Sequence, residues 1–167
     1  MADLDQAPVV LRLDGITKRF GSLVANQGVD LVLRRGEVLA LLGENGAGKT
    51  TLMNILFGHY VADEGSVSVA GPDGVLAPLP PGSPHAALAA GIGMVHQHFT
   101  LAENLTGLEN IMLGTEPVLR FRKRTGAARR KVEAVMRESG LAVDLDVQVS
   151  RLTVGERQRI EILKALY

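Results

Sequence analysis

Apolar and polar residues alternate along three stretches of the N-terminal half of the chain. The stretches are residues 9–13, 28–33 and 65–70, and each alternates as a strand with one buried and one solvated face does. Antiparallel strands are commonly solvated on one face, whereas parallel strands are buried on both. The alternation therefore predicts a small antiparallel β flank.

Two shorter stretches are apolar without alternation. They are residues 37–42, Glu-Val-Leu-Ala-Leu-Leu, and residues 92–95, Ile-Gly-Met-Val. Near-continuous apolar runs of this length are typical of strands that a parallel sheet buries on both faces. We therefore predict an α/β fold in which a parallel core lies beside the antiparallel flank.

Helical patterns separate these strands. Residues 50–57 predict a helix that ends at Gly58, and residues 84–90 predict a shorter one. Residues 71–84 contain too many prolines and glycines for regular structure, so we expect an exposed loop there.

A longer helical pattern follows the second apolar run. From residue 103 to about residue 150 the period is helical, with Val132, Val135 and Met136 on one stripe and Gly140 as a stop signal. The pattern predicts a helical unit inserted after the second core strand.

Residues 43–50 fit the phosphate-binding pattern G-x-x-x-x-G-K-[ST] at every fixed position. Gly46 and Gly48 have no Cβ atom, so the backbone N–H groups of this phosphate loop can close around a phosphate. Lys49 would reach the β- and γ-phosphates, and the Thr50 hydroxyl would ligate Mg²⁺. We therefore expect ATP with Mg²⁺ as the cofactor. The residues expected to bind it here are Gly43, Asn45, Gly46, Ala47, Gly48, Lys49, Thr50 and Thr51.

Composition narrows the class of protein. Eighteen Lys and Arg residues balance eighteen Asp and Glu residues, so no overall field favours nucleic acid or anionic lipid as a partner. The sequence has no cysteine, which suits a reducing compartment and excludes a disulfide framework. Residues 1–8 have no apolar core of a secretory signal, and no window reaches the roughly eighteen apolar residues of a membrane span. We expect a protein that works at a membrane only through a partner.

Three further motifs resemble those of the ATP-binding subunits of ABC transporters, in the order of that family. Phe20, in Thr-Lys-Arg-Phe-Gly, resembles the aromatic residue that stacks on adenine. Gln97, in Met-Val-His-Gln-His-Phe, resembles the glutamine that positions Mg²⁺ and the attacking water and couples the site to the permease. Residues 152–159, Leu-Thr-Val-Gly-Glu-Arg-Gln-Arg, resemble the signature LSGGQ-x-Q-R. The resemblance implies catalytic roles for Lys49 and Gln97. It also implies a P-loop NTPase fold with a RecA-like core, an antiparallel β flank and an inserted helical subdomain.

The signature segment predicts a second anion site, at the start of a helix over residues 155–166. In the family this site faces the γ-phosphate held by a second subunit, so that two nucleotides lie between two head-to-tail domains. The resemblance thus assigns nucleotide contacts to Thr153 and Gly155. Val154 and Glu156 depart from the glycine and the glutamine of the signature.

Several of these residues have other interpretations. Phe20 could cap the hydrophobic core. His96 and His98 flank Gln97 as metal ligands would, but alternate residues of an extended segment point to opposite sides. We interpret the basic run at residues 120–131 as a solvated face, with a contact to a membrane partner or lipid headgroups as the alternative.

The resemblance also implies an organisation and partners. It divides the chain into a core with β flank (1–99), a helical subdomain (100–150) and the signature with its helix (151–167). The expected partners are a second ATP-binding domain, transmembrane permease subunits and, indirectly, a solute-binding protein, at the cytoplasmic face of the cell membrane and without nucleic acid. The short spacing between motifs excludes long coiled-coil arms, and the motifs resemble the first cassette of bacterial importers of simple sugars or nucleosides.

One part of the family pattern has no counterpart here. No apolar run that ends in Asp-Glu follows Leu152, so the Walker B aspartate and the catalytic glutamate are missing. We expect a domain that is incomplete at its C-terminal side, binds ATP weakly or partially and does not hydrolyse it alone. The alternative is a regulatory module that binds nucleotide and never hydrolyses it. In either case we expect unpaired strand edges and exposed apolar surface.

Overall fold

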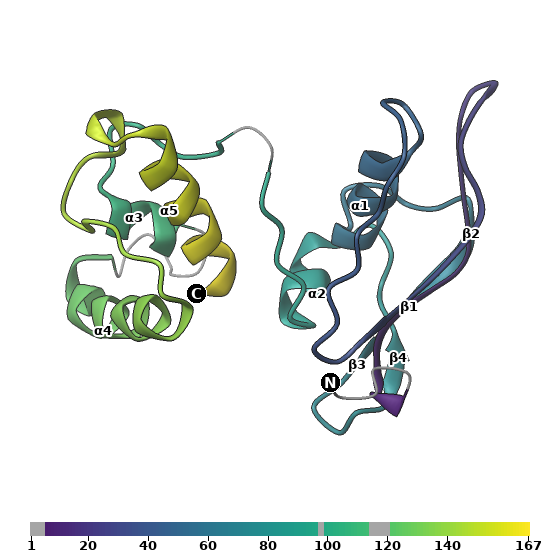
Figure 1. Ribbon diagram of the computed structural model, residues 1–167, viewed down its shortest axis with the longest axis horizontal. Coiled ribbons are helices and arrows are strands. Elements are labelled where there is room, and N and C mark those ends of the chain that lie inside the picture. The colour runs from purple at the N-terminus through teal and green to yellow at the C-terminus, as the bar shows by residue number, and fades with distance from the viewer. Residues whose placement is uncertain (1–5, 97–98, 114–120) are drawn as a thin grey trace. The chain divides into compact units, whose positions relative to one another are not determined.

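A computed structural model of the protein describes residues 6–96, 99–113 and 121–167. The chain divides into two compact units, Met1–Gly93 and Met94–Tyr167. Figure 1 shows the strands with α1 and α2 in the first unit, and α3, α4 and α5 in the second. Each unit has a hydrophobic core of its own.

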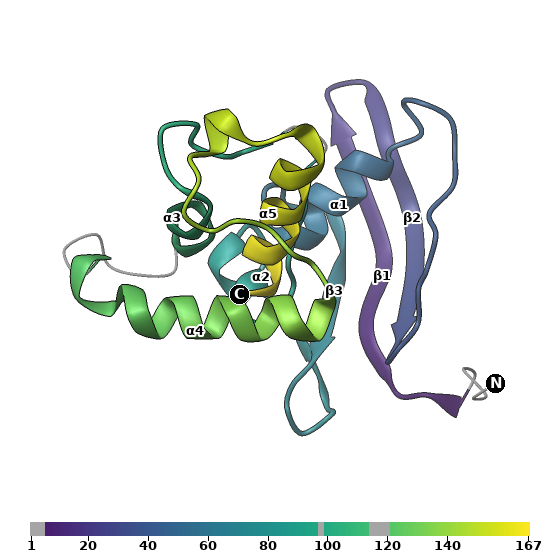
Figure 2. The same cartoon turned by 60° about the vertical axis from the view of Figure 1, so that its left-hand side comes forward.

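The first unit is built on a four-stranded antiparallel sheet in the order β2-β1-β3-β4. The alternating stretches of the sequence lie in the three longer strands, so this prediction is confirmed. The bounds are Val9–Phe20 for β1, Leu23–Arg34 for β2, Glu64–Ala70 for β3 and Leu76–Pro78 for β4. Short β4 lies within the stretch predicted as a loop, where Ala77 pairs with Val69 of β3. Figure 2 shows β1 and β2 side by side as a long hairpin.

Helix α1, Lys49–Phe57, follows the phosphate loop and ends at Gly58, as predicted. Its buried residues Leu52 and Ile55 pack against the sheet, where the apolar positions of β1 and β3 face them. Helix α2, Pro84–Ala89, is the predicted short helix and begins at Ser83, whose hydroxyl accepts from the Ala86 N–H. The sheet side chains of this core are Leu11, Leu13, Ile16 and Val67.

The two predicted core strands are not strands in the part of the chain that the structure describes. Residues 37–42 and 92–95 have no ladder partner there, and the described sheet is antiparallel throughout. Val38 is 96% exposed and Leu42 89% exposed, so the first run forms exposed apolar surface of the kind that the sequence predicts. A strand exists only with a hydrogen-bonded neighbour, and an apolar run does not supply one. These two predictions are therefore wrong for the described residues.

The second unit is helical. It contains α3 (Gly107–Met112), α4 (Phe121–Ser139), a 3₁₀ turn (Val149–Arg151) and α5 (Val154–Leu166). Val132 of the predicted stripe is buried, Val135 and Met136 pack against the same core, and α4 stops before Gly140 as expected. Other residues central to this core are Ile111, Val149, Ile160 and Leu163. Among the described helices, none combines the length and the apolar character that crossing a membrane requires.

Candidate functional site

The phosphate loop is an exposed turn between the apolar run and α1. The Ala47 N–H donates to the Glu44 carbonyl at 3.2 Å, which closes the turn. Gly46 has a φ of 88° and Gly48 a φ of 82°, a left-handed backbone that residues with a Cβ rarely adopt. The loop is exposed over residues 43–47, so it presents its backbone to solvent.

Gly48 is also the point where the loop touches the sheet. A Cβ atom at this position would lie 2.2 Å from the Ala25 carbonyl oxygen and 2.7 Å from the Asn26 amide nitrogen. The loop backbone therefore lies directly against β2, and only glycine fits there. The Asn26 side chain donates to the Gly48 carbonyl at 3.3 Å, yet its own carboxamide oxygen is buried without a hydrogen-bond partner. Leaving such a group unsatisfied costs about 1–3 kcal/mol.

Helix α1 begins without a side-chain cap. Gly48 stands at the N-cap, no side chain accepts from the first turn, and the first helical bond runs from the Leu52 N–H to the Gly48 carbonyl at 2.9 Å. The N–H groups of Lys49, Thr50 and Thr51 precede that bond, so they have no helical acceptor. Together with the helix dipole they form an anion-binding position.

The Lys49 ammonium lies inside the loop. It donates to the carbonyl oxygens of Gly43 at 2.6 Å and Glu44 at 2.7 Å. The Lys49 charge, which the sequence predicts to contact the phosphates, is thus held at the loop by backbone carbonyls of the loop. Thr50 is exposed in the first turn of α1, and Thr51 is half-buried beside it.

The oxygen donors of this loop fit an Mg²⁺ ion that is bound together with nucleotide phosphates. Within the described residues, no three His, Asp or Glu side chains gather in a way that could hold a metal ion. Mg²⁺ usually binds through one or two protein ligands together with phosphate oxygens. The exposed Thr50 hydroxyl at the start of α1 is a suitable protein ligand of that kind.

Phe20 lies at the end of β1, in the same unit as the phosphate loop. Phe20 is 44% exposed and its ring contacts Tyr60 edge-on, with centroids 5.6 Å apart, and the Lys18 ammonium lies 5.5 Å from the ring centre. Lys18 pairs with Asn26 in the β1–β2 ladder, and Phe20 is two residues further along. Two residues of strand span about 7 Å, so the aromatic ring and Gly48 occupy the same end of the hairpin.

The signature helix begins differently. Thr153 is the N-cap of α5, its hydroxyl accepts from the Glu156 N–H, and the Glu156 carboxylate accepts from the Thr153 N–H at 2.8 Å and from its hydroxyl at 2.7 Å. This is a complete capping box. The hydroxyl and backbone hydrogen bonds from Thr153 hold the pKa of the Glu156 carboxyl below its ordinary value, so the group is charged at neutral pH. Gly155, also exposed, follows in the first turn.

The predicted residue Gln97 lies outside the described residues, as does His98, so neither the coupling role nor the metal-cluster alternative is tested. The basic run begins outside them as well. In its described part, Arg129 forms ion pairs with Glu133 and Asp146, and Lys131 donates to the Tyr167 carbonyl. The Asp146 carboxylate, through its hydrogen bond, raises the pKa of the Arg129 guanidinium above its ordinary value.

Two buried polar side chains hold the segment that enters the second unit. Glu161 of α5 is 3% exposed and accepts from the Thr100 N–H at 2.5 Å and hydroxyl at 3.0 Å. Asn110 of α3 is fully buried and exchanges two hydrogen bonds with the Ala102 backbone, at 2.7 and 3.0 Å. Sequence patterns did not reveal these residues or Asn26, because isolated polar residues within apolar patterns match no motif.

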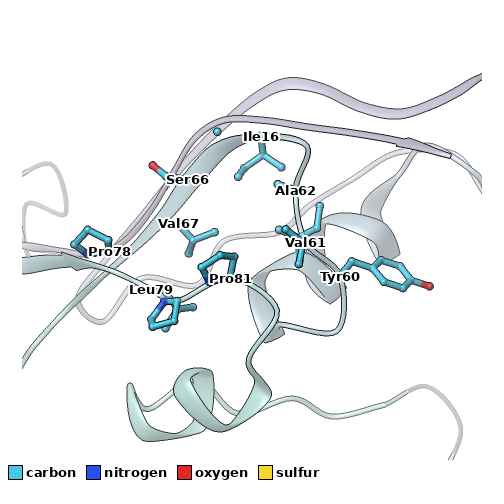
Figure 3. A pocket seen from close by; sticks show the side chains of 12 residues that line it. Ile16, Tyr60, Val61, Ala62, Ser66, Val67, Pro78, Leu79 and Pro81 are labelled. Carbon is cyan, nitrogen blue, oxygen red and sulfur yellow. The ribbon is translucent and has the colours of Figure 1, made fainter. Parts of the chain in front are cut away.

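An apolar pocket of about 250 Å³ lies elsewhere in the first unit. Figure 3 shows its lining, which includes Ile16 of β1, Val67 of β3, Val61 after α1, and Leu79 and Pro81 of the proline-rich loop. Its lining includes neither a charged side chain nor any residue of the phosphate loop, all of which are described. This pocket therefore does not suit a triphosphate.

Comparison with known proteins identifies import ATP-binding proteins as relatives. The chain is 46% identical over 158 residues to the nucleoside import ATP-binding protein NupA of Lactococcus lactis, a match that covers 95% of this chain and 30% of that protein. It is 40% identical over 185 residues to the glucose import ATP-binding protein TsgD13 of Haloferax volcanii, covering 94% and 33%. It is 46% identical over 158 residues to the ribose import ATP-binding protein RbsA 1 of Burkholderia thailandensis, covering 94% and 30%. The chain thus spans about a third of the length of these curated relatives.

Solved structures agree with this result. A nucleotide-free ATP-binding cassette from an ABC transporter matches with a TM-score of 0.70 and 28% identity, over 95% of this chain and 64% of that one. The ADP conformation of an ABC transporter cassette matches with a TM-score of 0.71 and 28% identity, over the same shares. The predicted fold class, a P-loop NTPase of mixed α/β structure, is confirmed. Because the family model described as ABC transporter matches residues 26–167, the chain belongs to the ABC transporter ATP-binding family.

Proposed function

We propose that this chain is the nucleotide-binding part of an ABC importer subunit that couples ATP binding and hydrolysis to uptake of a sugar or nucleoside. The observation that carries the proposal is the uncapped start of α1, with Lys49 held beside it. A triphosphate brings several negatively charged oxygens, and this position offers free N–H groups, a positive helix end and an ammonium group.

The remaining residues take the roles that the family motifs suggest. Gly43 to Thr51 bind the phosphates, Thr50 and Gln97 ligate Mg²⁺, and Gln97 positions water. Phe20 stacks on adenine, which is supported by its partly exposed ring at the hairpin end that also carries Gly48. Bound Mg²⁺ would neutralise phosphate charge as it develops, while the chain's own N–H groups and Lys49 hold the phosphates in place.

The signature segment acts in trans in this proposal. Thr153 and Gly155 face the γ-phosphate held by a second ATP-binding domain, in a head-to-tail dimer. The complex also contains transmembrane permease subunits, works with a solute-binding protein and lies at the cytoplasmic face of the membrane. Import of a nucleoside or a simple sugar is supported by the similarity to NupA, TsgD13 and RbsA 1.

The test is a calorimetric titration of the purified 167-residue chain with Mg-ATP, together with a phosphate-release assay. We expect weak, saturable binding and turnover near background, since the chain has no counterpart of the Walker B and glutamate residues. Lys49→Ala removes a charged donor, and we expect about 10–100-fold weaker binding. Lys164→Ala, in α5, is the matched control and should bind as the wild type does.

Two outcomes would contradict parts of this proposal. If Lys49→Ala binds Mg-ATP as tightly as the wild type does, the phosphate loop is not the ATP site. Robust turnover that Lys49→Ala abolishes would show that the chain hydrolyses ATP without the missing carboxylates. Binding without turnover, even when a complete partner domain is added, would favour the regulatory module instead.

A further inference from the structure

Asn26 stands out among the described polar side chains. It lies on β2 and is 7% exposed. Among the buried side-chain nitrogen and oxygen atoms of the described residues, only its carboxamide oxygen has no hydrogen-bond partner. Rotating the amide by half a turn would not help, because the oxygen would then face the Gly48 carbonyl, which is also an acceptor. The chain thus retains an unfavourable buried polar group at this position, beside the phosphate loop.

The other half of the same side chain makes a specific contact. The Asn26 amide nitrogen donates to the Gly48 carbonyl oxygen at 3.3 Å, and the same oxygen accepts the first helical bond from the Leu52 N–H at 2.9 Å. Both lone pairs of this carbonyl are therefore used, one by α1 and one by β2. The peptide that begins α1 is therefore held by one hydrogen bond within the helix and one from β2.

This contact has a geometric consequence for the anion-binding position. The Gly48 carbonyl and the Lys49 N–H belong to one planar trans peptide, so they point in opposite directions. Fixing the carbonyl toward Asn26 and the helix aims the Lys49 N–H outward from the helix start. The left-handed φ of Gly48 and its close approach to Ala25 leave this peptide little other freedom.

We propose that Asn26 is a positioning residue of the phosphate loop: it orients the Gly48–Lys49 peptide so that the first N–H of α1 faces the bound phosphate. The inference rests on the proposed function, because the ligand is the phosphate chain of the nucleotide. An apolar residue of similar size would remove the unsatisfied oxygen and suit folding better, so the cost of the amide is accounted for by ligand binding.

The proposal predicts that affinity and stability separate. Asn26→Leu keeps the volume and removes both polar atoms. We expect its affinity for Mg-ATP and for inorganic tripolyphosphate, which has no base or ribose, to fall about tenfold through loss of one hydrogen bond that orients a donor. Its melting temperature should equal or exceed that of the wild type. Gln27→Leu, the exposed neighbour on β2, is the matched control and should retain both affinities.

Hydrogen exchange of the ligand-free chain provides a second measurement. In Asn26→Leu and in Asn26→Ala, we expect the Leu52 amide, which donates to the Gly48 carbonyl, to exchange faster, while the amides of β1 and of the second unit are unchanged. If Asn26→Leu does not fold, Asn26→Ala is judged by the same two measurements, with affinity taken relative to its change in melting temperature.

The proposal is overturned if Asn26→Leu binds tripolyphosphate as the wild type does, or if its melting temperature falls in step with its affinity, since either result would give Asn26 a purely structural role. If the wild type binds neither ligand, the proposed function fails instead. The positioning of the peptide is then decided by hydrogen exchange alone, and unchanged exchange of the Leu52 amide would reject it.

Discussion

The starts of α1 and α5 are two helix N-termini built on opposite principles. At α1 the N-cap is Gly48, no side chain closes the first turn, and the Lys49 ammonium is held at the adjoining loop. At α5 the N-cap is Thr153, and the Glu156 carboxylate already occupies the positive end of the helix. An anion site therefore depends on what the chain leaves unsatisfied. The first helix end is open to phosphate, whereas the second carries its own anion.

This contrast bears on the two predicted phosphate contacts of α5. A phosphate from a partner domain that approaches Thr153 and Gly155 meets a carboxylate whose pKa is lowered by the Thr153 hydrogen bonds. Like charges at one helix end repel, so Glu156 would have to leave the capping box for a close approach. In the proposed dimer, phosphate binding at the start of α5 would therefore carry the cost of displacing Glu156, whereas binding at the start of α1 would not.

The largest effect should come from replacing the glycine at the start of α1. Gly48→Ala would place a Cβ atom 2.2 Å from the Ala25 carbonyl and impose a left-handed φ of 82° on alanine. The backbone strain alone is about 1–2 kcal/mol, and the contact adds to it. We expect calorimetry to show Mg-ATP affinity about 100-fold lower or worse.

Gly126→Ala is the matched control for that substitution. Gly126 is exposed in α4, where alanine favours the helix, and the variant should bind Mg-ATP unchanged. If Gly48→Ala binds as well as this control does, the open end of α1 is not the phosphate site.

A smaller effect should follow from opening the closed end. Thr153→Ala removes the side-chain cap of α5, which typically costs about 1 kcal/mol. For a chain of this size we expect thermal melting about 2–4 °C lower. At a concentration where the chain is monomeric, Mg-ATP affinity should be unchanged, because the chain's own phosphate loop is untouched. Thr106→Ala, which removes the same kind of capping box from α3, should give a similar loss. A fall in ATP affinity for Thr153→Ala would contradict the independence of the two helix starts.

The smallest effect is the pH dependence of the α5 cap. The folded-state pKa of Glu156 lies below its unfolded value, so its charge stabilises the protein above the unfolded pKa and this contribution is lost as the pH falls through the folded pKa. Glu156→Gln keeps the capping geometry without the charge. We expect the wild type to melt slightly higher than this variant at pH 7. The difference should shrink once the pH falls below about 4, where an ordinary glutamate protonates, and vanish only below the lower folded-state pKa. A difference that stays constant across this range would mean that the charge of Glu156 does not contribute.

Most of the fold could be predicted from local sequence patterns. The strands at residues 9–13, 28–33 and 65–70 and the helix closed by Gly58 follow from periodicity and from glycine at a helix end, both of which are local properties. The run at residues 37–42 resembles a buried strand for an equally sound reason. Pairing, however, depends on a second segment, which a run of apolar residues does not specify.

The site shows the same division. Gly46, Gly48 and Lys49 could be placed from spacing alone, because phosphate binding uses consecutive backbone groups. The Thr153–Glu156 capping box also fits a local pattern, T-x-x-E, and could have been recognised. Asn26 and Glu161 could not, because each acts on a segment distant in sequence, and only the folded chain brings donor and acceptor together.

The two hydrogen bonds from Lys49 to the carbonyls of Gly43 and Glu44 mean that the loop folds around its own cation. Fixing a flexible lysine side chain costs up to about 2 kcal/mol of conformational entropy. Here that loss is incurred when the loop forms, before any nucleotide arrives. An incoming triphosphate therefore meets an ammonium group already in place, and its oxygens have only to compete with two backbone carbonyls.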